Sequence, residues 1–363
     1  MGFGDFMEVS TEFPDVVKLV FRKYLSVLEG KDYPLHYVVK SIEVEFKPDD
    51  SLRRLWQLHD VALQEMWDLI SEQRSGEIIG LRPKQSLLDL KICIAENIVR
   101  SCHFCENRCR VNRFAGQVGK CRCPYRVVVH SAFTHYGEES FVSPSFTIFT
   151  LGCNFHCVYC QNWRISQWYD EGTNLDYSYM AYLVDEAFDR GARNLNLYGG
   201  EPTPWIHEWL KVIKEIKKPI PILFNSNGYF TPEAQKILEG VVDIMKIDLK
   251  YGNDDCARKL SGVENYWDIV TRNTKACVGK FMLLLRHLIL PNHVECCSEK
   301  ILKWLSQEIE PDKYVLNIMT QYQPEYRVLR GEFPELARHV NKDEVEKVVK
   351  LAKDLGLSYI VER

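Results

Sequence analysis

The stretch that decides the fold is SPSFTIFTLGCNFHCVYC, residues 143–160, in which a strand-like apolar run leads directly into three cysteines. Cys153, Cys157 and Cys160 have the spacing C-x3-C-x2-C. Three thiolates are one fewer than the set that holds an ordinary cubane iron–sulfur cluster, so a cluster bound here keeps one iron without a protein ligand. An open coordination position is typical of metal sites that do chemistry. Because the cysteines follow a strand, we expect them at its carboxyl end, where barrel-like α/β folds carry their active sites.

From residue 143 onward, strand-like and helix-like segments alternate. The predicted strands are 145–150, 194–199, 220–228, 242–250, 281–290 and 314–320. The helices between them are predicted at 176–191, 205–216, 231–240, 265–279 and 294–309, and one more helix and strand follow near the end of the sequence. Repeated βα units indicate a parallel sheet, closed or partly closed. We therefore expect an α/β fold, a partial (β/α)6 TIM-like barrel.

Composition excludes several classes of protein. Of the 363 residues, 46% are hydrophobic and 26% charged, as in ordinary globular proteins. The formal net charge of −4 gives no overall basic field for nucleic acid, and no apolar run is long enough to span a bilayer. The first residues, MGFGDFMEVSTEFPD, lack the features of a secretory signal, and Phe6 breaks the myristoylation pattern. We expect a cytoplasmic protein with neither nucleic acid nor membrane as a partner.

The chain divides into three expected units. Apolar residues at helical spacing in 14–30 and 50–70 predict that residues 1–95 form a helical N-terminal extension. Residues 71–86 are polar and contain Gly and Pro, which predicts a linker. Residues 96–142 form a cysteine-rich metal or iron–sulfur segment that follows a short predicted helix, 87–99, and residues 143–363 form the partial barrel. A helical cover on the barrel is the favoured interpretation of the extension, and a recognition module for a macromolecular substrate is the alternative.

A second cysteine group lies in the middle unit. Cys102, Cys105, Cys109 and Cys121 have the spacing C-x2-C-x3-C-x11-C, and Cys123 is a spare. Four thiolates close a tetrahedral zinc site or hold a second iron–sulfur cluster. The spacing matches neither a paired zinc ribbon nor a ferredoxin run, so both identities stay open. The other cysteines are interpreted as small core or surface residues; they are Cys93, Cys256, Cys277, Cys296 and Cys297.

Polar residues follow each predicted strand at the end where the active sites of such folds are assembled. They form five groups after the cysteine loop: Tyr198 to Glu201, Asn225 to Asn227, Asp248 with Lys250, Arg286 with His287, and Gln321 to Gln323. Each group by itself is weak evidence, since a glycine pair is more often a turn and a buried Asp–Lys pair more often structural. Their occurrence at successive strand ends predicts one shared site.

These motifs resemble those of radical S-adenosylmethionine (SAM) enzymes. CNFHCVYC is similar to that superfamily's C-x3-C-x-aromatic-C motif. Residues 96 to 362 resemble the pyruvate formate-lyase activating enzymes, in particular homologues that carry a four-cysteine segment before the SAM motif. The matching stretches are CRVNRFAGQVGKC, CVYCQNWRISQ, GGEPTP, DIMKIDLKY, RHLILPNH and MTQYQPEYR. The resemblance is specific for the superfamily and much less specific for the substrate.

The resemblance implies a role for each motif. Cys153, Cys157 and Cys160 would hold a catalytic [4Fe–4S] cluster whose open iron is chelated by SAM. The implied SAM contacts are Tyr159 near the adenine, Gly199, Gly200 and Glu201 at the methionine amino group, Asp248 and Lys250 at the ribose and carboxylate, and Arg286 at the carboxylate.

Three further positions belong to the implied site or lie beside it. Asn225 and Ser226 are also implied SAM-site residues, and they stand where activating enzymes carry an acidic residue and a hydroxyl. The amide in place of the acid puts a cation site there in doubt. His287 could assist Arg286, but neighbouring residues on a strand usually point to opposite faces.

The resemblance also implies an anaerobic activity. With an electron from a flavodoxin or ferredoxin, such an enzyme cleaves SAM to a 5′-deoxyadenosyl radical, which removes hydrogen from a substrate. A glycyl-radical activase that acts on a partner protein is the first expectation. Another radical modification of a protein or peptide, such as methylation, epimerisation or crosslinking, is the alternative that the four-cysteine segment mildly favours. A non-catalytic iron–sulfur electron carrier is a distant third, because it would not need the GGE and D-x-K motifs.

Overall fold

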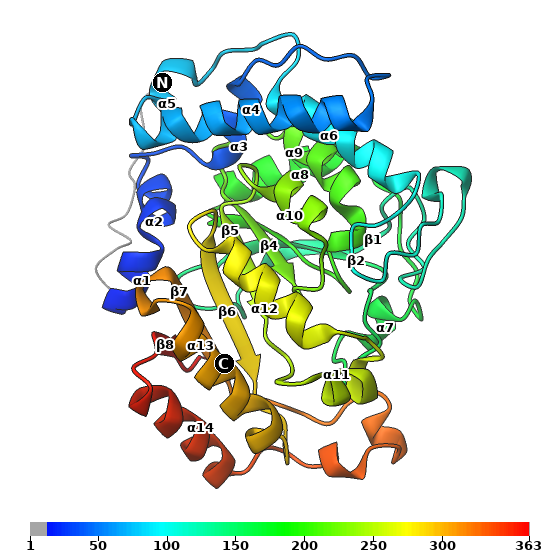
Figure 1. Cartoon of the computed structure of the whole chain (residues 1–363), viewed down its shortest axis with the longest axis vertical. Coiled ribbons are helices and arrows are strands. Elements are labelled where there is room, and N and C mark those ends of the chain that lie inside the picture. The colour runs from blue at the N-terminus through cyan, green and yellow to red at the C-terminus, as the bar shows by residue number, and fades with distance from the viewer. Residues whose placement is uncertain (1–12, 363) are drawn as a thin grey trace.

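One eight-stranded sheet organises the computed structural model, which describes residues 13–362 (Figure 1). Its strands follow chain order: β1 (Val129–His135), β2 (Ser145–Thr150), β3 (Asn194–Leu197), β4 (Ile222–Ser226), β5 (Ile244–Asp248), β6 (Met282–Leu288), β7 (Tyr314–Met319) and β8 (Tyr359–Ile360). Strands β2 to β8 pair in parallel, and β1 pairs with β2 antiparallel. Because β1 and β8 are the two edges, the barrel is partial, and the predicted fold class is confirmed.

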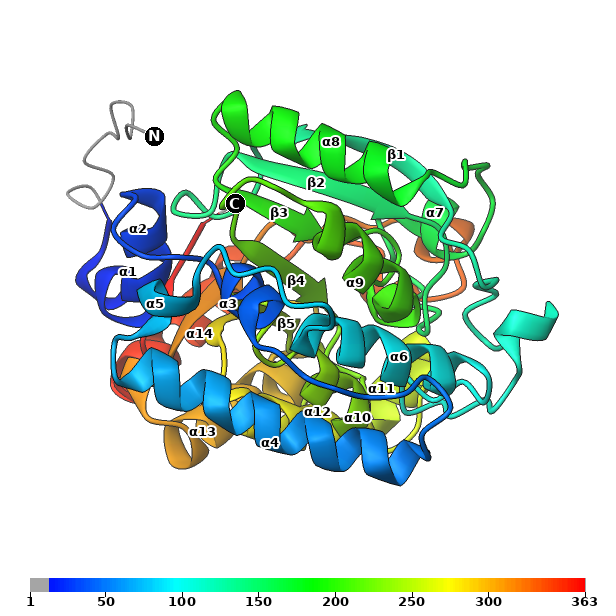
Figure 2. The same ribbon diagram turned by 90° about the horizontal axis from the view of Figure 1, so that it is seen from above.

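The helices that link the parallel strands lie outside the sheet (Figure 2). They are α7 (Trp163–Ser166), α8 (Tyr177–Asp189), α9 (Ile206–Glu215), α10 (Pro232–Leu238), α11 (Asp254–Ser261), α12 (Tyr266–Cys277), α13 (Glu299–Glu308) and α14 (Lys342–Asp354). A π-helical turn, η4 (Val294–Ser298), precedes α13, so the predicted helix 294–309 begins with a wider turn. Strand β1 and helix α11 were not predicted from the sequence.

The barrel interior is built in layers because side chains alternate along each strand. At the amino ends of the strands, Leu223, Ile244, Leu284 and Val315 form an apolar floor. Two helices close this floor, α1 (Asp15–Val20) and α2 (Arg22–Leu28), with Val17, Phe21, Tyr24 and Leu25 in the same cluster (Figure 1). The sequence predicted one helix over 14–30, and the structure divides it at Phe21.

The rest of the helical extension packs on the outside of the barrel. It comprises α3 (Leu35–Ser41), α4 (Leu52–Ser71), α5 (Ser75–Ile78) and α6 (Leu87–Val99). Helix α4 packs on α6, and α6 packs on α9 and α10 (Figure 1). Leu55, Leu63 and Met66 of α4 belong to the main core. Between residues 13 and 362, no helix is both long and apolar enough to cross a membrane. The segment used to exclude a secretory signal falls largely within residues 1–12, outside the described residues.

Candidate functional site

The three cysteines of the opening motif lie in the loop between β2 and α7. Hydrogen-bond donors approach each sulfur: the backbone N–H of Phe155 lies 3.3 Å from Cys153 Sγ, and Ser261 Oγ donates to Cys157 Sγ at 2.9 Å. The Cys160 Sγ atom lies 3.4 Å from a serine hydroxyl. Donors of this kind stabilise thiolates and tune the potential of a cluster that thiolates hold. The loop therefore suits an iron–sulfur cluster with three protein ligands.

The glycine pair after β3 is pressed against the start of this loop. A Cβ atom on Gly200 would lie 2.1 Å from the carbonyl oxygen of Gly152. Gly199 has φ +117°, and its Cβ would lie 2.4 Å from the backbone nitrogen of Thr150. Backbone atoms cannot turn aside as a side chain can, so only glycine allows this approach. The two loops are thereby held in close contact.

Glu201 lies beside the cluster loop, and its carboxylate points into a buried hydrogen-bond network. It accepts from Ser226 Oγ at 2.7 Å, from the backbone N–H of Asn227 at 2.9 Å and from Thr203 Oγ1 at 2.5 Å. Burial raises the pKa of the Glu201 carboxyl. Burial and the nearby Glu201 charge both raise the pKa of the Cys153 thiol, which reflects how close the two groups are.

A cavity of about 150 Å³ opens at the carboxyl ends of the parallel strands. Half of the twelve predicted site residues line it: Cys157, Tyr159, Cys160, Asp248, Lys250 and Arg286. The other six do not line it: Cys153, Gly199, Gly200, Glu201, Asn225 and Ser226. Gln161 and Gln323 line the cavity and are exposed to solvent, so they mark its mouth.

The charged groups of the cavity are already paired. Lys250 Nζ lies 2.7 Å from Asp248 Oδ2. Burial would lower the pKa of Lys250, but the Asp248 carboxylate, together with Tyr159 and Cys157, outweighs burial and raises that pKa well above its usual value. Arg286 donates through Nε to Glu139 and through Nη2 to Glu138, each at 2.6 Å. Its Nη1 atom makes no hydrogen bond to residues 13–362, so one edge of the guanidinium remains for a ligand.

A chain of hydroxyl groups runs from the cavity wall to the cluster loop. The Tyr159 hydroxyl lies 2.8 Å from that of Tyr251, which lies 2.6 Å from Ser261 Oγ. Ser261 is the residue that donates to Cys157 Sγ. The ring of Tyr159 meets Tyr322 edge-on, with 6.0 Å between centroids. This chain fixes the aromatic residue of the motif in one orientation.

A buried donor on β4 has no protein partner. Asn225 Nδ2 finds no acceptor among the described residues, although the side chain is only 3% exposed. Leaving a buried donor unsatisfied costs about 1–3 kcal/mol. A bound ligand or water with an acceptor atom would remove this cost. Asn225 therefore fits its predicted place in a ligand site.

The structure adds residues to the site that the sequence prediction did not include. Glu138 and Glu139 precede the first predicted strand, and no motif links them to Arg286. Leu288 also lines the cavity, and its position two residues after Arg286 could have indicated it. His287 points to the other face, as alternation predicts, and lies between Leu249 O at 2.7 Å and the Ser298 hydroxyl at 2.8 Å.

The four-cysteine segment has a small cavity of its own. The cavity is lined by Cys102, Cys105, Cys109 and Cys121. Cys123 does not line it and instead contacts the carbonyl oxygens of Cys121 and Leu151, at 3.4 and 3.9 Å. Four thiols around one cavity supply the type of ligand that a zinc ion or an iron–sulfur cluster takes.

Comparison with known proteins decides the family. The family model of the radical SAM superfamily matches residues 147–305. Uncharacterized protein MJ0674 of Methanocaldococcus jannaschii is 39% identical over 344 residues, which cover 93% of this chain and 98% of that protein. The chain belongs to the radical SAM superfamily. Membership implies an enzyme that uses a [4Fe–4S] cluster and SAM, and the cysteine loop, the cavity and the unpaired donor described above fit both.

Other similarities are more distant. The GTP 3′,8-cyclase of Nautilia profundicola is 28% identical over 92 residues, which cover 25% of this chain and 29% of the cyclase. Among solved structures, Streptococcus suis SuiB bound to S-adenosylmethionine is 14% identical with a TM-score of 0.44. That match covers 58% of this chain and 48% of SuiB.

Proposed function

We propose that this radical SAM enzyme removes hydrogen from a protein or peptide, in the manner of a glycyl-radical activase. One observation carries the proposal: two cluster cysteines, the Asp248–Lys250 pair and Arg286 line a single cavity at the carboxyl ends of the strands. A protein that only carried electrons would not need paired charges beside an open iron. The activase-like motifs of the sequence support the choice of branch.

Each side of the cavity suits one part of SAM. Cys153, Cys157 and Cys160 would hold the cluster, and the free edge of Arg286 suits a carboxylate. Asp248 suits the ribose hydroxyls, and Tyr159 offers a fixed aromatic edge to the adenine. When bound and reduced by a flavodoxin or ferredoxin, the cluster and SAM together supply a 5′-deoxyadenosyl radical. The protein orients these groups and keeps water out.

The surroundings of the mouth support a polypeptide substrate. Trp163 and Tyr326, which follow Gln161 and Gln323 closely in the chain, stack with 5.1 Å between ring centroids. Tyr169 meets Trp163 edge-on and is 56% exposed. Aromatic side chains are enriched where proteins bind other polypeptides. This aromatic group offers a binding surface next to the mouth.

The first experiment measures SAM cleavage. The protein is reconstituted anaerobically, iron, sulfide and zinc are counted, and 5′-deoxyadenosine is measured after addition of dithionite and SAM. We expect cleavage by the wild type, none by Cys157→Ala, and wild-type cleavage by the control Cys93→Ala. A fully loaded cluster that neither binds nor cleaves SAM would overturn the proposal in favour of an electron carrier.

The second experiment distinguishes a glycyl-radical activase from an enzyme that makes another radical modification. Protein extract from the source organism grown with glycine deuterated at Cα is added, and deuterium in the released 5′-deoxyadenosine is measured by mass spectrometry. Deuterium transfer, together with a glycine radical in the electron paramagnetic resonance spectrum, supports an activase. A stable mass change in an extract protein or peptide without a glycine radical supports another radical modification instead.

A further inference from the structure

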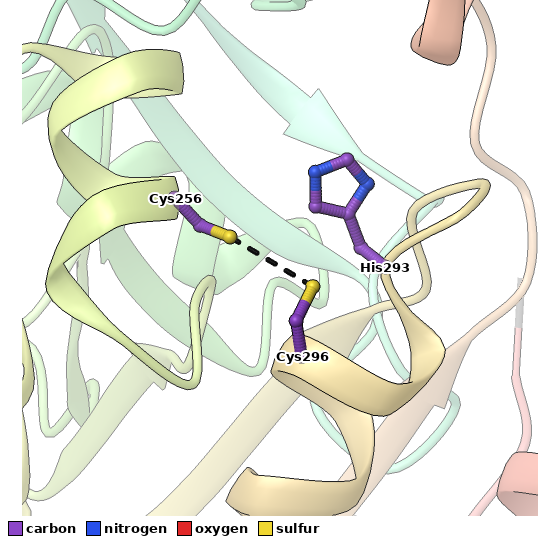
Figure 3. A group of neighbouring side chains, drawn as sticks. All are labelled: Cys256, His293 and Cys296. Atoms are coloured by element: carbon purple, nitrogen blue, oxygen red, sulfur yellow. Dashed lines mark hydrogen bonds between the residues drawn. The ribbon is translucent and has the colours of Figure 1, made fainter.

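A third group of sulfur and nitrogen ligands lies apart from both cysteine sites. Cys256 of α11 meets His293 and Cys296 from the turn that leads into α13 (Figure 3). Within residues 13–362, one ligand atom from each of the three lies within 4.8 Å of the other two. Cys297 is adjacent, with its Sγ atom 3.8 Å from Cys296 Sγ. None of these residues lines the SAM cavity.

The backbone around the group is arranged to hold these side chains in place. The side chain of Asn253 accepts from the backbone N–H of Cys256 at 2.8 Å and donates to the carbonyl oxygen of Cys296 at 2.8 Å. It thereby caps α11 and ties it to the opposite turn. That turn, η4, is a π-helix, a form that often marks functional sites.

His293 is oriented for ligation. Its Nδ1 atom lies 2.8 Å from the carbonyl oxygen of Pro291, a pairing in which the ring nitrogen donates. The proton therefore sits on Nδ1, and Nε2 keeps its lone pair. Histidines that bind metals commonly donate their other ring N–H to a backbone carbonyl in this way.

The sulfur spacing matches a tetrahedral metal site. Cys256 Sγ and Cys296 Sγ are 3.8 Å apart, as are Cys296 Sγ and Cys297 Sγ. Two sulfurs bound at about 2.3 Å to one tetrahedral zinc ion lie roughly 3.8 Å apart. A disulfide would require about 2.05 Å. The observed distances are therefore too long for a disulfide and match two ligands of one zinc ion.

We propose that Cys256, His293 and Cys296 bind a zinc ion. Soft thiolate and imidazole ligands are typical of zinc sites. The interpretation of Cys256 and Cys296 from the sequence as isolated core or surface residues is replaced by this assignment. The spacing H-x2-C-C of residues 293–297 was the available signal, but nothing in the sequence connects it to Cys256.

The zinc ion would fix the start of a helix whose end supports the cluster loop. At the far end of α11, the carbonyl oxygens of Leu260 and Ser261 accept the backbone N–H groups of Val158 and His156, at 2.9 and 3.0 Å. The role is structural, because the ion would lie outside the cavity. The inference does not depend on the proposed substrate or on SAM cleavage.

The first test counts zinc in matched variants of the full chain. Zinc per chain is measured by mass spectrometry in the wild type, Cys256→Ser, Cys296→Ser and the control Cys93→Ser. We expect each of the first two variants to hold one zinc fewer than the wild type, and the control to hold the wild-type amount, whatever metal the four-cysteine segment holds. Equal zinc content in all four proteins would overturn the proposal.

The second test uses the wild type alone, so it does not depend on whether a variant folds. Iodoacetamide labelling of Cys256 and Cys296 is followed by peptide mass spectrometry before and after zinc is removed with a chelator. We expect labelling at least ten times slower before removal, and X-ray absorption at the zinc edge to show sulfur and nitrogen ligands. Equal labelling rates, or a Cys256–Cys296 disulfide, would contradict a zinc site.

Discussion

At the scale of single residues, two glycines position two different cysteine groups. Gly200 lies against the backbone of the SAM-cluster loop, and Gly119 lies against a thiol of the four-cysteine segment. Each contact is made possible by a missing Cβ atom, so an alanine at either position tests how closely the two groups are packed. Gly76, whose Cβ would meet nothing within 4 Å, provides a matched control for both.

Gly200→Ala should damage the SAM site. Its Cβ would lie 2.1 Å from the Gly152 carbonyl oxygen, so the cysteine loop must shift. We expect a loss of about 1–3 kcal/mol in the free energy of unfolding and SAM cleavage lowered on the order of 100-fold by misplacement. Calorimetry and the 5′-deoxyadenosine assay measure the two effects. Activity equal to that of Gly76→Ala would contradict the described packing.

Gly119→Ala should weaken the four-cysteine site specifically. The new Cβ would lie 2.9 Å from Cys109 Sγ and force that thiol out of place. We expect metal affinity at this site to fall about 10-fold, as when other supporting residues of a metal site are changed. Metal retained after dialysis against a chelator gives the measurement. Unchanged retention would show that Cys109 is not a ligand.

Individual residues also show how far the sequence predicts the site. Asp248 and Lys250 could be placed at a strand end from the pattern alone, and the structure puts them in the cavity. Glu201 was predicted beside SAM, but its hydrogen bonds to Ser226 and Asn227 depend on how two loops meet in space. Contacts between segments far apart in the chain leave no local pattern in the sequence.

At the scale of elements, regular periodicity predicts helices well and short segments poorly. Helix α6 has the predicted bounds, 87–99, because a capping box formed by Ser86 and Asp89 fixes its start. Helix α11 was missed because it has eight residues and buries only Ala257, Leu260 and Ser261. Yet α11 carries Cys256 at one end and the support for the cluster loop at the other.

Substitutions of Asn253, which caps α11, should lower stability by an amount that depends on how many of its hydrogen bonds are lost. Asn253→Ala loses both the cap and the hydrogen bond to Cys296 O, whereas Asn253→Ser keeps a capping oxygen. We expect a loss of about 2 kcal/mol for alanine and about 1 kcal/mol for serine in the free energy of unfolding. Urea titration measures both. Equal losses would mean that the cap contributes nothing.

At the scale of the whole molecule, a buried charged layer separates the apolar floor from the cavity that Arg286 lines. Lys246 Nζ lies 2.6 Å from Glu138 and 2.9 Å from Glu139, and Arg286 completes the group. Burial alone would raise the pKa of Glu138, but the two cations outweigh it and lower that pKa to about 2. The parallel sheet could be predicted from alternating segments, but this layer could not, because Glu138 and Glu139 come from the β1–β2 connection.

The charged layer should make the free energy of unfolding depend on pH in the acidic range. Because the pKa of Glu138 falls from 4.5 to about 2 on folding, its contribution is complete above pH 4.5 and is lost as pH falls toward 2. We expect Glu138→Gln to lower the free energy of unfolding by about 3 kcal/mol at pH 7, and by less at pH 3. Urea titrations at both values measure the difference.

An exposed glutamate provides the control for this prediction. Glu346 pairs with Lys342 at 3.2 Å, with both side chains more than half exposed. Glu346→Gln should change stability by no more than about 0.5 kcal/mol at either pH. A difference between wild type and Glu138→Gln that stays constant from pH 7 to pH 3 would show that the carboxylate is not stabilised by its cations.

The floor of the barrel has a consequence for how the protein is made. Its apolar cluster joins Val17 and Phe21 to Val315 and Ile360, which are synthesised much later in the chain. The apolar side chains of α1 and α2 therefore stay exposed to solvent until the later strands have been synthesised. Contacts so far apart in the chain slow folding and expose the nascent protein to aggregation. Helices α1 and α2 are therefore where a chaperone would be most useful during synthesis.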